Sequence, residues 1–89
     1  MKESDINKKI QDHVTKLGGY IIKTIASNRA GVPDMLACIE GKFYGFEGKT
    51  AKGKASPLQL HHIDLINKAG GIAGVVRSIA DVDALIARC

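Results

Sequence analysis

The stretch that decides the fold is residues 31–49, GVPDMLACIEGKFYGFEGK, whose pattern predicts two strands joined by a tight turn. A two-residue turn at positions 40–41 fixes the antiparallel register and sets Asp34 directly opposite Glu47. Residues in that relationship have Cβ atoms about 5 Å apart, and Lys49 shares a strand face with Glu47 because side chains alternate. We therefore expect two carboxylates and one ammonium group to converge at one end of this hairpin.

Two like charges opposite each other destabilise a sheet, so this arrangement needs a cation, either a bound metal or the neighbouring ammonium. Asp34 and Glu47 offer the hard oxygen ligands that Mg²⁺ or Mn²⁺ prefers, and the Gly48 carbonyl could add another. The alternative is a solvated stripe of Glu47 and Lys49 on an edge strand, with Asp34 capping the turn after Pro33. The hairpin taken alone leaves both interpretations open.

The length of 89 residues predicts one domain, residues 1–89, and is short enough for dimerisation to help stability. Hydrophobic residues make up 45% of the chain but aromatic residues only 4%, which indicates an aliphatic core. The net charge of +4 favours a polyanionic partner such as nucleic acid. Cys38 and Cys89 have no metal-ligand or disulfide spacing, and no signal peptide or long apolar run is present. We expect a cytoplasmic, intracellular protein without membrane association.

The hairpin strands are apolar on both faces, so the sheet that contains them needs helices on both sides. Amphipathic spacing and β-branched runs supply the other elements. A further helix begins after Ser56, and a last one begins after Ser78. The expected fold is α/β, with a mixed central sheet of about four strands in the order α-β-β-β-α-β-α: helix 4–17, strands 20–26, 34–39 and 42–49, helix 57–69, strand 72–77 and a C-terminal helix.

The second helix opens with a complete set of N-terminal signals in Ser56, Pro57 and Gln59. Serine is a preferred N-cap, proline suits the first turn, and a glutamine three residues after the cap completes a capping box. The first turn of a helix also presents free N–H groups to anions. Gln59 thus has a structural explanation that does not exclude a second role.

Together, Gly31-Val32-Pro33-Asp34, the following hairpin, Glu47-Gly48-Lys49 and the helical Gln59 resemble the PD-(D/E)xK nuclease pattern. Gln59 makes the chain similar to the virus-type replication-repair nuclease (VRR-NUC) branch, and the element order is similar to its small stand-alone members. These look like minimal relatives of archaeal Holliday-junction resolvases. The resemblance implies a restriction-endonuclease-like core and an Mg²⁺- or Mn²⁺-dependent DNA endonuclease. One departure is Gly48, where the family usually carries a β-branched residue.

The resemblance also implies roles for particular residues. Asp34, Glu47 and the Gly48 carbonyl would hold the metal, while Lys49 would orient the attacking water or stabilise the pentavalent charge. Gln59 would act near the metal and the scissile phosphate. The products would carry 5′-phosphate and 3′-hydroxyl ends.

A helical acid near the N-terminus contacts the metal in this family, often through water, and Glu3 lies at the matching place. The alternative for Glu3 is a favourable interaction with the positive end of the helix dipole. These two interpretations stay open at the level of the sequence.

Two loops beside the predicted site carry candidate DNA contacts. Ser27, Asn28 and Arg29 could donate to phosphate oxygens, and Arg29 is close enough in sequence to Asp34 to hold a strand near the metal. Lys52 and Lys54 form a compact basic source of phosphate contacts. The alternatives are that residues 27–30 are ordinary turn formers and that residues 50–55 form a solvent-exposed loop without a role in DNA binding.

The small stand-alone relatives suggest a homodimer whose two sites cut opposed strands of a four-way junction, because a two-fold pair of sites suits a nearly two-fold substrate. The resemblance implies activity in DNA repair, inside a bacterial or phage-infected cell, with no organic cofactor. A non-catalytic DNA-binding or assembly module, and a nuclease acting on flaps, simple duplex or RNA, remain alternatives.

Overall fold

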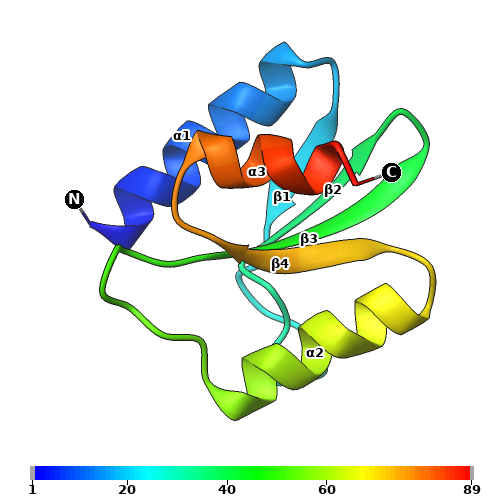
Figure 1. Ribbon diagram of the computed structural model, residues 1–89. Helices are drawn as coiled ribbons and strands as arrows, with labels where there is room; N and C mark the ends of the chain where they lie inside the picture. Colours follow the sequence, from blue (N-terminus) through cyan, green and yellow to red (C-terminus); the bar gives the residue numbers. More distant parts are fainter. Residues whose placement is uncertain (1, 89) are drawn as a thin grey trace.

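The computed structural model describes residues 2–88, which form a mixed four-stranded sheet with helices on both faces (Figure 1). The strand order is β1-β2-β3-β4; the first three strands pair antiparallel, and β4 runs parallel to β3. This arrangement confirms the predicted α/β fold and its element order. The elements are α1 (Glu3–Lys16), β1 (Tyr20–Lys23), β2 (Met35–Ile39), β3 (Lys42–Gly48), α2 (Pro57–Lys68), β4 (Ile72–Val76) and α3 (Ile79–Ile86).

A tight turn joins β2 to β3. Glu40 and Gly41 have φ angles of 51° and 79°, the positive values that a type I′ hairpin turn requires at both central residues. Ile39 pairs with Lys42 directly beside this turn, as the two-residue connection predicts. The register of the whole hairpin follows from that local geometry.

The same register extends to the far end of the hairpin, where Met35 pairs with Phe46. Asp34 immediately precedes Met35, and Glu47 immediately follows Phe46. The two acids therefore lie next to each other just past this last pair of the hairpin. Asp34 precedes the strand instead of opening it, whereas the sequence pattern included it in the strand. Lys49 likewise follows β3 directly, and its N–H donates to the carbonyl of Val76 at 3.0 Å.

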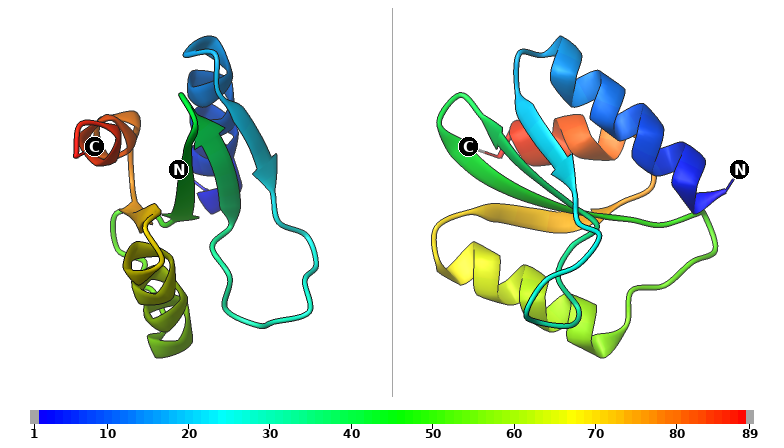
Figure 2. Two further views of the ribbon diagram at one scale, coloured as in Figure 1. Left: turned by 90° about the vertical axis from the view of Figure 1, so that its right-hand side faces the viewer. Right: turned by 180° about the vertical axis from the view of Figure 1, so that it is seen from behind.

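The two faces of the sheet are covered differently. Helices α1 and α3 lie on one face and α2 on the other, and the views in Figure 2 agree with Figure 1 on this. The core under α1 and α3 is mainly aliphatic, as the composition predicts, because aromatic residues contribute only two members. Its buried residues are Ile6, Ile10, Val14, Met35, Ala37, Ile39, Tyr44, Phe46, Val76, Val82 and Leu85.

Strand β1 is shorter than predicted. It ends at Lys23, and Ile25, expected inside the strand, is 93% exposed. Thr24 closes the pairing, because its N–H donates to the Asp34 carbonyl at 2.8 Å and its hydroxyl to the Pro33 carbonyl at 2.7 Å. The residues just before Asp34 lie outside the sheet. Ile25 therefore has no neighbouring strand to pair with, although it is β-branched. Residues 25–33 therefore form a wide loop (Figure 2).

Helix α2 packs against the part of the sheet formed by β3 and β4. The loop that precedes β2 also touches it, because a Cβ placed at Gly31 would collide with Leu58 and approach His62. This close approach holds the loop, and with it Asp34, next to the N-terminal half of α2. Within residues 2–88, none of the helices has the length and apolar character needed to span a membrane.

Candidate metal centre

Three carboxylates from three elements meet at one end of the sheet. Oxygen atoms of Glu3, Asp34 and Glu47 all lie within 4.8 Å of one another. Glu3 belongs to the first turn of α1, Asp34 immediately precedes β2, and Glu47 lies near the end of β3. The structure thus brings together the two acids that the hairpin register pairs and the helical acid that the resemblance suggested.

Glu47 is fully buried, with 0% of its surface exposed. Strand β3 lies between β2 and β4, so the interpretation of Glu47 and Lys49 as a solvated stripe on an edge strand is wrong. Oε1 of Glu47 and Oδ2 of Asp34 are buried and have no hydrogen-bond partner among the described residues. Buried carboxylate oxygens are stable only with donors or a cation, so these two atoms fit a metal-binding role.

Burial raises the pKa of Glu47 from its ordinary value of 4.5 to about 7. The negative charge of Asp34 raises this pKa as well, and Glu3 adds a smaller effect in the same direction, while Lys49 lowers it. In the absence of a metal, Glu47 therefore exchanges its proton near neutral pH. A cation among the three carboxylates would favour the ionised form.

Lys49 lies beside Glu47, as strand alternation predicts. Its Nζ is 3.5 Å from Glu47 Oε2, and its side chain is only 13% exposed. One ammonium group faces three carboxylates here, so the site carries excess negative charge when all of them are ionised. That excess is what a divalent cation would neutralise.

Gln59 contributes to the helix cap and to the acid cluster at once. Its Oε1 accepts from the Ser56 N–H at 2.8 Å, and its own N–H donates to the Ser56 hydroxyl at 3.2 Å, which completes the predicted capping box. Its Nε2 donates to Glu47 Oε2 at 3.1 Å. The structural explanation of Gln59 is thus confirmed, and the same side chain also contacts an acid of the cluster, while its role near the metal and the scissile phosphate stays a prediction. The bond also leaves the other oxygen of Glu47 as the one without a donor.

Gly48 has a steric explanation. A Cβ at this position would overlap Oδ1 of Asn7 and lie 3.1 Å from its Cγ, so a β-branched residue would not fit beside Asn7. Asn7 comes from α1 and is buried with the apolar residues of that helix. The sequence analysis did not single out Asn7; a polar residue next to the apolar helix stripe was the available signal.

The loop that leads into the site presents some of its predicted residues to Asp34. Ser27, Arg29 and Asp34 help to line a hollow of about 220 Å³. The Ser27 hydroxyl bonds to the backbone of Arg29, accepting from its N–H at 3.1 Å and donating to its carbonyl at 2.5 Å. Ordinary turn chemistry therefore accounts for Ser27. Asn28 is exposed in the same loop.

The basic loop after β3 is held by a residue that the sequence analysis missed. Arg77 Nη1 donates to the carbonyls of Thr50 and Gly53, each at 2.6 Å. These bonds anchor the segment that carries Lys52 and leads to Lys54, both of which are exposed. The available signal was a cationic residue at the end of the predicted strand 72–77; in the structure β4 ends at Val76 and Arg77 follows it.

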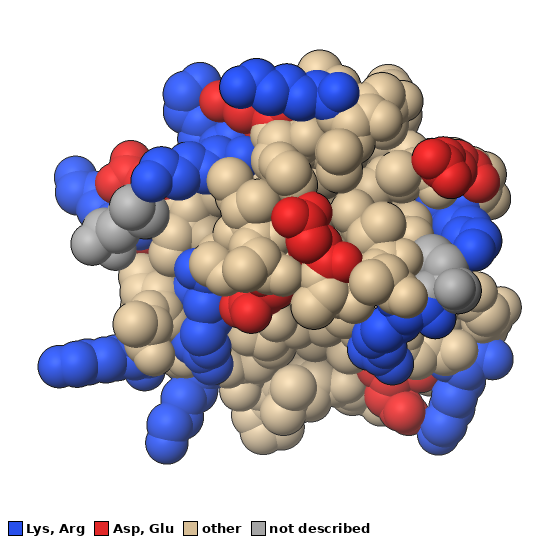
Figure 3. Space-filling model, turned by 45° about the horizontal axis from the view of Figure 1, so that its top comes forward, with Lys and Arg blue, Asp and Glu red and all other residues tan. Residues whose placement is uncertain are grey.

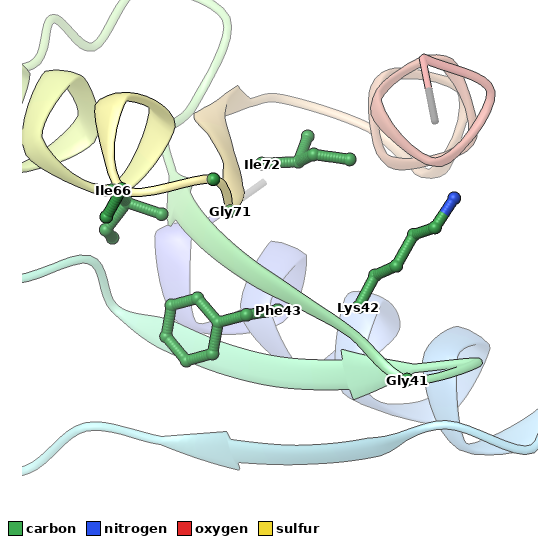
Figure 4. Close-up of a pocket in the computed structure, with 8 residues that line it drawn as sticks. Gly41, Lys42, Phe43, Ile66, Gly71 and Ile72 are labelled. Atoms are coloured by element: carbon green, nitrogen blue, oxygen red, sulfur yellow. The ribbon is translucent and has the colours of Figure 1, made fainter.

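Two further surface features are a hollow outside the acid cluster and the distribution of charged side chains. A hollow of about 660 Å³ sits at the turn end of the hairpin (Figure 4), and none of the three carboxylates of the acid cluster lines it. Lys and Arg side chains are spread around the margins of the face in Figure 3, with Asp and Glu side chains between them. The net positive charge is therefore distributed on this face, without a single basic patch. The hollow is lined by Gly41, Lys42, Phe43, Ile66, Ala69, Gly70, Gly71 and Ile72.

No protein-family model matches the chain. The curated protein "Putative nuclease p44" of Acyrthosiphon pisum secondary endosymbiont phage 1 is 36% identical over 61 residues, which cover 67% of this chain and 66% of that protein. The chain thus spans just under two thirds of that relative.

Two of the solved structures that share the fold show how close the similarity is. Hjc of Archaeoglobus fulgidus, a Holliday junction resolvase, aligns with a TM-score of 0.65 and 16% identity, covering 84% of this chain and 67% of that one. A structure described as a VRR_NUC domain aligns with a TM-score of 0.79 and 31% identity, covering 94% of this chain and 92% of that one. Sequence identity at this level, over nearly the full length of both chains and together with the acid cluster, shows that the chain belongs to the VRR-NUC family of nuclease domains.

Proposed function

We propose that this protein is a divalent-metal-dependent endonuclease that hydrolyses phosphodiester bonds of DNA. The observation that carries the proposal is the meeting of Glu3, Asp34 and Glu47 within 4.8 Å. Two buried oxygens of this cluster have no hydrogen-bond partner among the described residues. Lys49 beside the cluster completes the kind of constellation that phosphodiester hydrolysis needs.

The donor set suits Mg²⁺ or Mn²⁺, because all its members are hard oxygen atoms. In this proposal Asp34 and Glu47 bind the cation together with the backbone carbonyl of Gly48, and Glu3 contributes directly or through water. The chemistry that such a cation supplies is polarisation of a phosphate oxygen and acidification of a water molecule. The carboxylates provide the charge and the fixed geometry that hold it.

Lys49 and Gln59 act beside this donor set. The Lys49 ammonium, 3.5 Å from Glu47 Oε2, orients the attacking water or stabilises the negative charge of the pentavalent phosphorus. Gln59 holds the same Oε2 at 3.1 Å and so fixes the orientation of the Glu47 carboxylate. Because Gln59 is also part of a helix cap, its side chain is restrained before substrate arrives.

The phosphate backbone of DNA is held by the two loops that flank the acids. Arg29 lines the hollow beside Asp34, where its guanidinium can bind a phosphate, with Ser27 and Asn28 in the same loop. Lys52 and Lys54 contribute from the basic loop on the other side. Binding through these contacts should weaken with salt, because each phosphate contact releases counterions.

We propose a four-way junction as the preferred substrate and a homodimer as the active form. The fold is shared with Hjc, which is a Holliday junction resolvase. The sheet face near β1 is not covered by α2 and exposes apolar or uncharged side chains that a second copy would cover. Tyr20, 71% exposed, is the most prominent, and the cross-strand row Tyr20–Cys38–Phe43 is exposed throughout. A two-fold pair of sites would match a nearly two-fold junction.

A cleavage assay on labelled four-way, flap, duplex and single-stranded DNA, with matched RNA junctions, tests the proposal in Mg²⁺ or Mn²⁺. We expect metal-dependent cutting that is strongest on four-way DNA and is abolished by Glu47→Gln. Glu40→Gln, an exposed acid in the hairpin turn, is the matched control and should cut normally. Equal activity of Glu47→Gln and wild type would overturn the proposed chemistry. Binding without cutting of any substrate would instead indicate a non-catalytic module.

A further inference from the structure

Asn7 is a buried polar residue that the hydrogen bonds of the fold do not explain. It is 3% exposed, and its Oδ1 has no hydrogen-bond partner among the described residues. A buried amide oxygen without a donor destabilises the folded state, so such a group calls for another explanation. Among the described residues, the other buried side-chain nitrogen or oxygen atoms without a partner are Asp34 Oδ2 and Glu47 Oε1, both in the acid cluster.

The side chain of Asn7 occupies the space that a Cβ would take at Gly48. Oδ1 and Cγ of Asn7 are the two atoms that such a Cβ would meet at less than ordinary contact distance. The next atom, Cε of Met35, would lie at 3.6 Å, which is normal van der Waals contact. Asn7 and Gly48 are therefore complementary in shape, and together they allow α1 to approach the end of β3 closely.

This contact lies one helical turn from Glu3. Residues four apart on a helix share a face, so Glu3 and Asn7 project on the same side of α1. Glu3 is the member of the acid cluster that the helix carries, whereas Asp34 and Glu47 are held by the hairpin. The spacing between α1 and β3 thus affects Glu3 without affecting the separation of the other two carboxylates.

We propose that Asn7 is a positioning residue that, seated against the bare Cα of Gly48, sets the distance at which Glu3 reaches the cation. The inference rests on the proposed metal-dependent function and assigns a specific role to Asn7, a residue outside the ligand set. A Cβ at position 48 would push the first turns of α1 outward and withdraw Glu3. Removal of the Asn7 side chain would then make room again.

Calorimetric titration of the protein with Mn²⁺, without DNA, tests this inference. Gly48→Ala and Glu3→Gln should each weaken Mn²⁺ binding about tenfold or more, the range found when groups that orient metal ligands are altered. The double variant Glu3→Gln/Gly48→Ala should bind no more weakly than Glu3→Gln, because Glu3 no longer contributes. The double variant Asn7→Ala/Gly48→Ala should recover most of the affinity lost in Gly48→Ala.

Three results would overturn the inference: wild-type affinity in Gly48→Ala, additive losses with Glu3→Gln, or no recovery in Asn7→Ala/Gly48→Ala. Thermal unfolding in EDTA checks that each variant is folded. If Gly48→Ala alone does not fold, the Asn7→Ala/Gly48→Ala variant decides: affinity near wild type supports the inference, and a loss as large as in Glu3→Gln rejects it.

A matched control separates this contact from a general effect of strand glycines. Gly74→Ala on β4 places a Cβ 3.2 Å from side-chain atoms of Leu85 on α3, with no atom of the acid cluster among the three nearest, and should leave Mn²⁺ affinity within about threefold of wild type. The two proposals also fail differently. Wild-type protein that binds no Mn²⁺ contradicts both, whereas binding that requires Glu47 but is unaffected by Gly48→Ala contradicts only the positioning role.

Discussion

Gln59 Nε2 donates a hydrogen bond to Glu47 Oε2 at 3.1 Å, so the capping residue of α2 also holds a carboxylate at the end of β3. This bond crosses from a helix on one face of the sheet to the only fully buried acid among the described residues. It couples the start of α2 to the candidate metal centre. A change at Gln59 should therefore affect both stability and chemistry.

We expect Gln59→Ala to lower both the free energy of unfolding and the rate of DNA cleavage. Loss of a capping interaction costs about 1 kcal/mol, and loss of the bond to Glu47 releases its carboxylate. Ser56→Ala is the control, because it removes a hydroxyl from the same cap without touching Glu47 directly. It should lower stability by a similar amount and leave most of the activity. Equal loss of activity in both variants would argue that only the cap matters.

The metal-free protein should lose stability as pH rises from about 4.5 to about 7. The pKa of Glu47 is raised to about 7 by burial and by Asp34, so in this window the unfolded chain has released a proton that the folded chain still binds. The melting temperature in EDTA, measured across this range, checks the prediction. Glu47→Gln should remove this part of the pH dependence. A flat profile in the wild type would contradict a raised pKa.

Lys49→Ala should reduce DNA cleavage at least a hundredfold while leaving binding of the same DNA nearly unchanged. The ammonium lies beside Glu47, and in the proposed mechanism it would orient the attacking water or stabilise the charge at the reacting phosphate, either of which has a large effect on rate. Single-turnover cleavage and fluorescence anisotropy measure the two quantities. Lys68→Ala, which removes an exposed lysine paired with Asp64 on α2, is the control and should keep normal activity.

Arg77→Ala should weaken DNA binding although Arg77 is not proposed to contact DNA. Its guanidinium anchors Thr50 and Gly53, so its loss leaves Lys52 in a less ordered loop. Arg77→Lys should give a similar defect, because a lysine keeps the charge but cannot reproduce the planar guanidinium group. Affinity measured over a range of salt concentrations distinguishes this from Lys52→Ala, which should reduce the salt slope by about one phosphate contact.

Tyr20→Glu should convert the proposed dimer to a monomer and reduce cleavage of four-way DNA. A charge in the middle of an exposed apolar surface opposes its burial by a second copy. Sedimentation or light scattering gives the mass. The control is Ile79→Glu at the start of α3, the helix that lies with α1 on the opposite face of the sheet from α2. A wild-type mass equal to one chain, both with and without DNA, would rule out the paired-site proposal.

The order of elements, the hairpin and the cap of α2 could all be predicted because each depends on residues close in sequence. The turn at Glu40 and Gly41 sets the register by local backbone geometry, and that register places Asp34 beside Glu47. The end of β1 was predicted too late in the chain. A strand extends only as far as the strand that it pairs with. Because β2 begins at Met35, which pairs with Lys23, β1 ends at Lys23.

What the sequence by itself determined was therefore the α/β order, the hairpin register and the pairing of two acids with a neighbouring lysine. Tertiary structure alone decided that Glu47 is buried, because β4 pairs with β3 from far along the chain. It also decided that Gln59 reaches Glu47 and that Asn7 fills the space over Gly48. Turns and caps follow from short-range backbone preferences, whereas burial and contacts between elements depend on which surfaces pack together after the chain has folded.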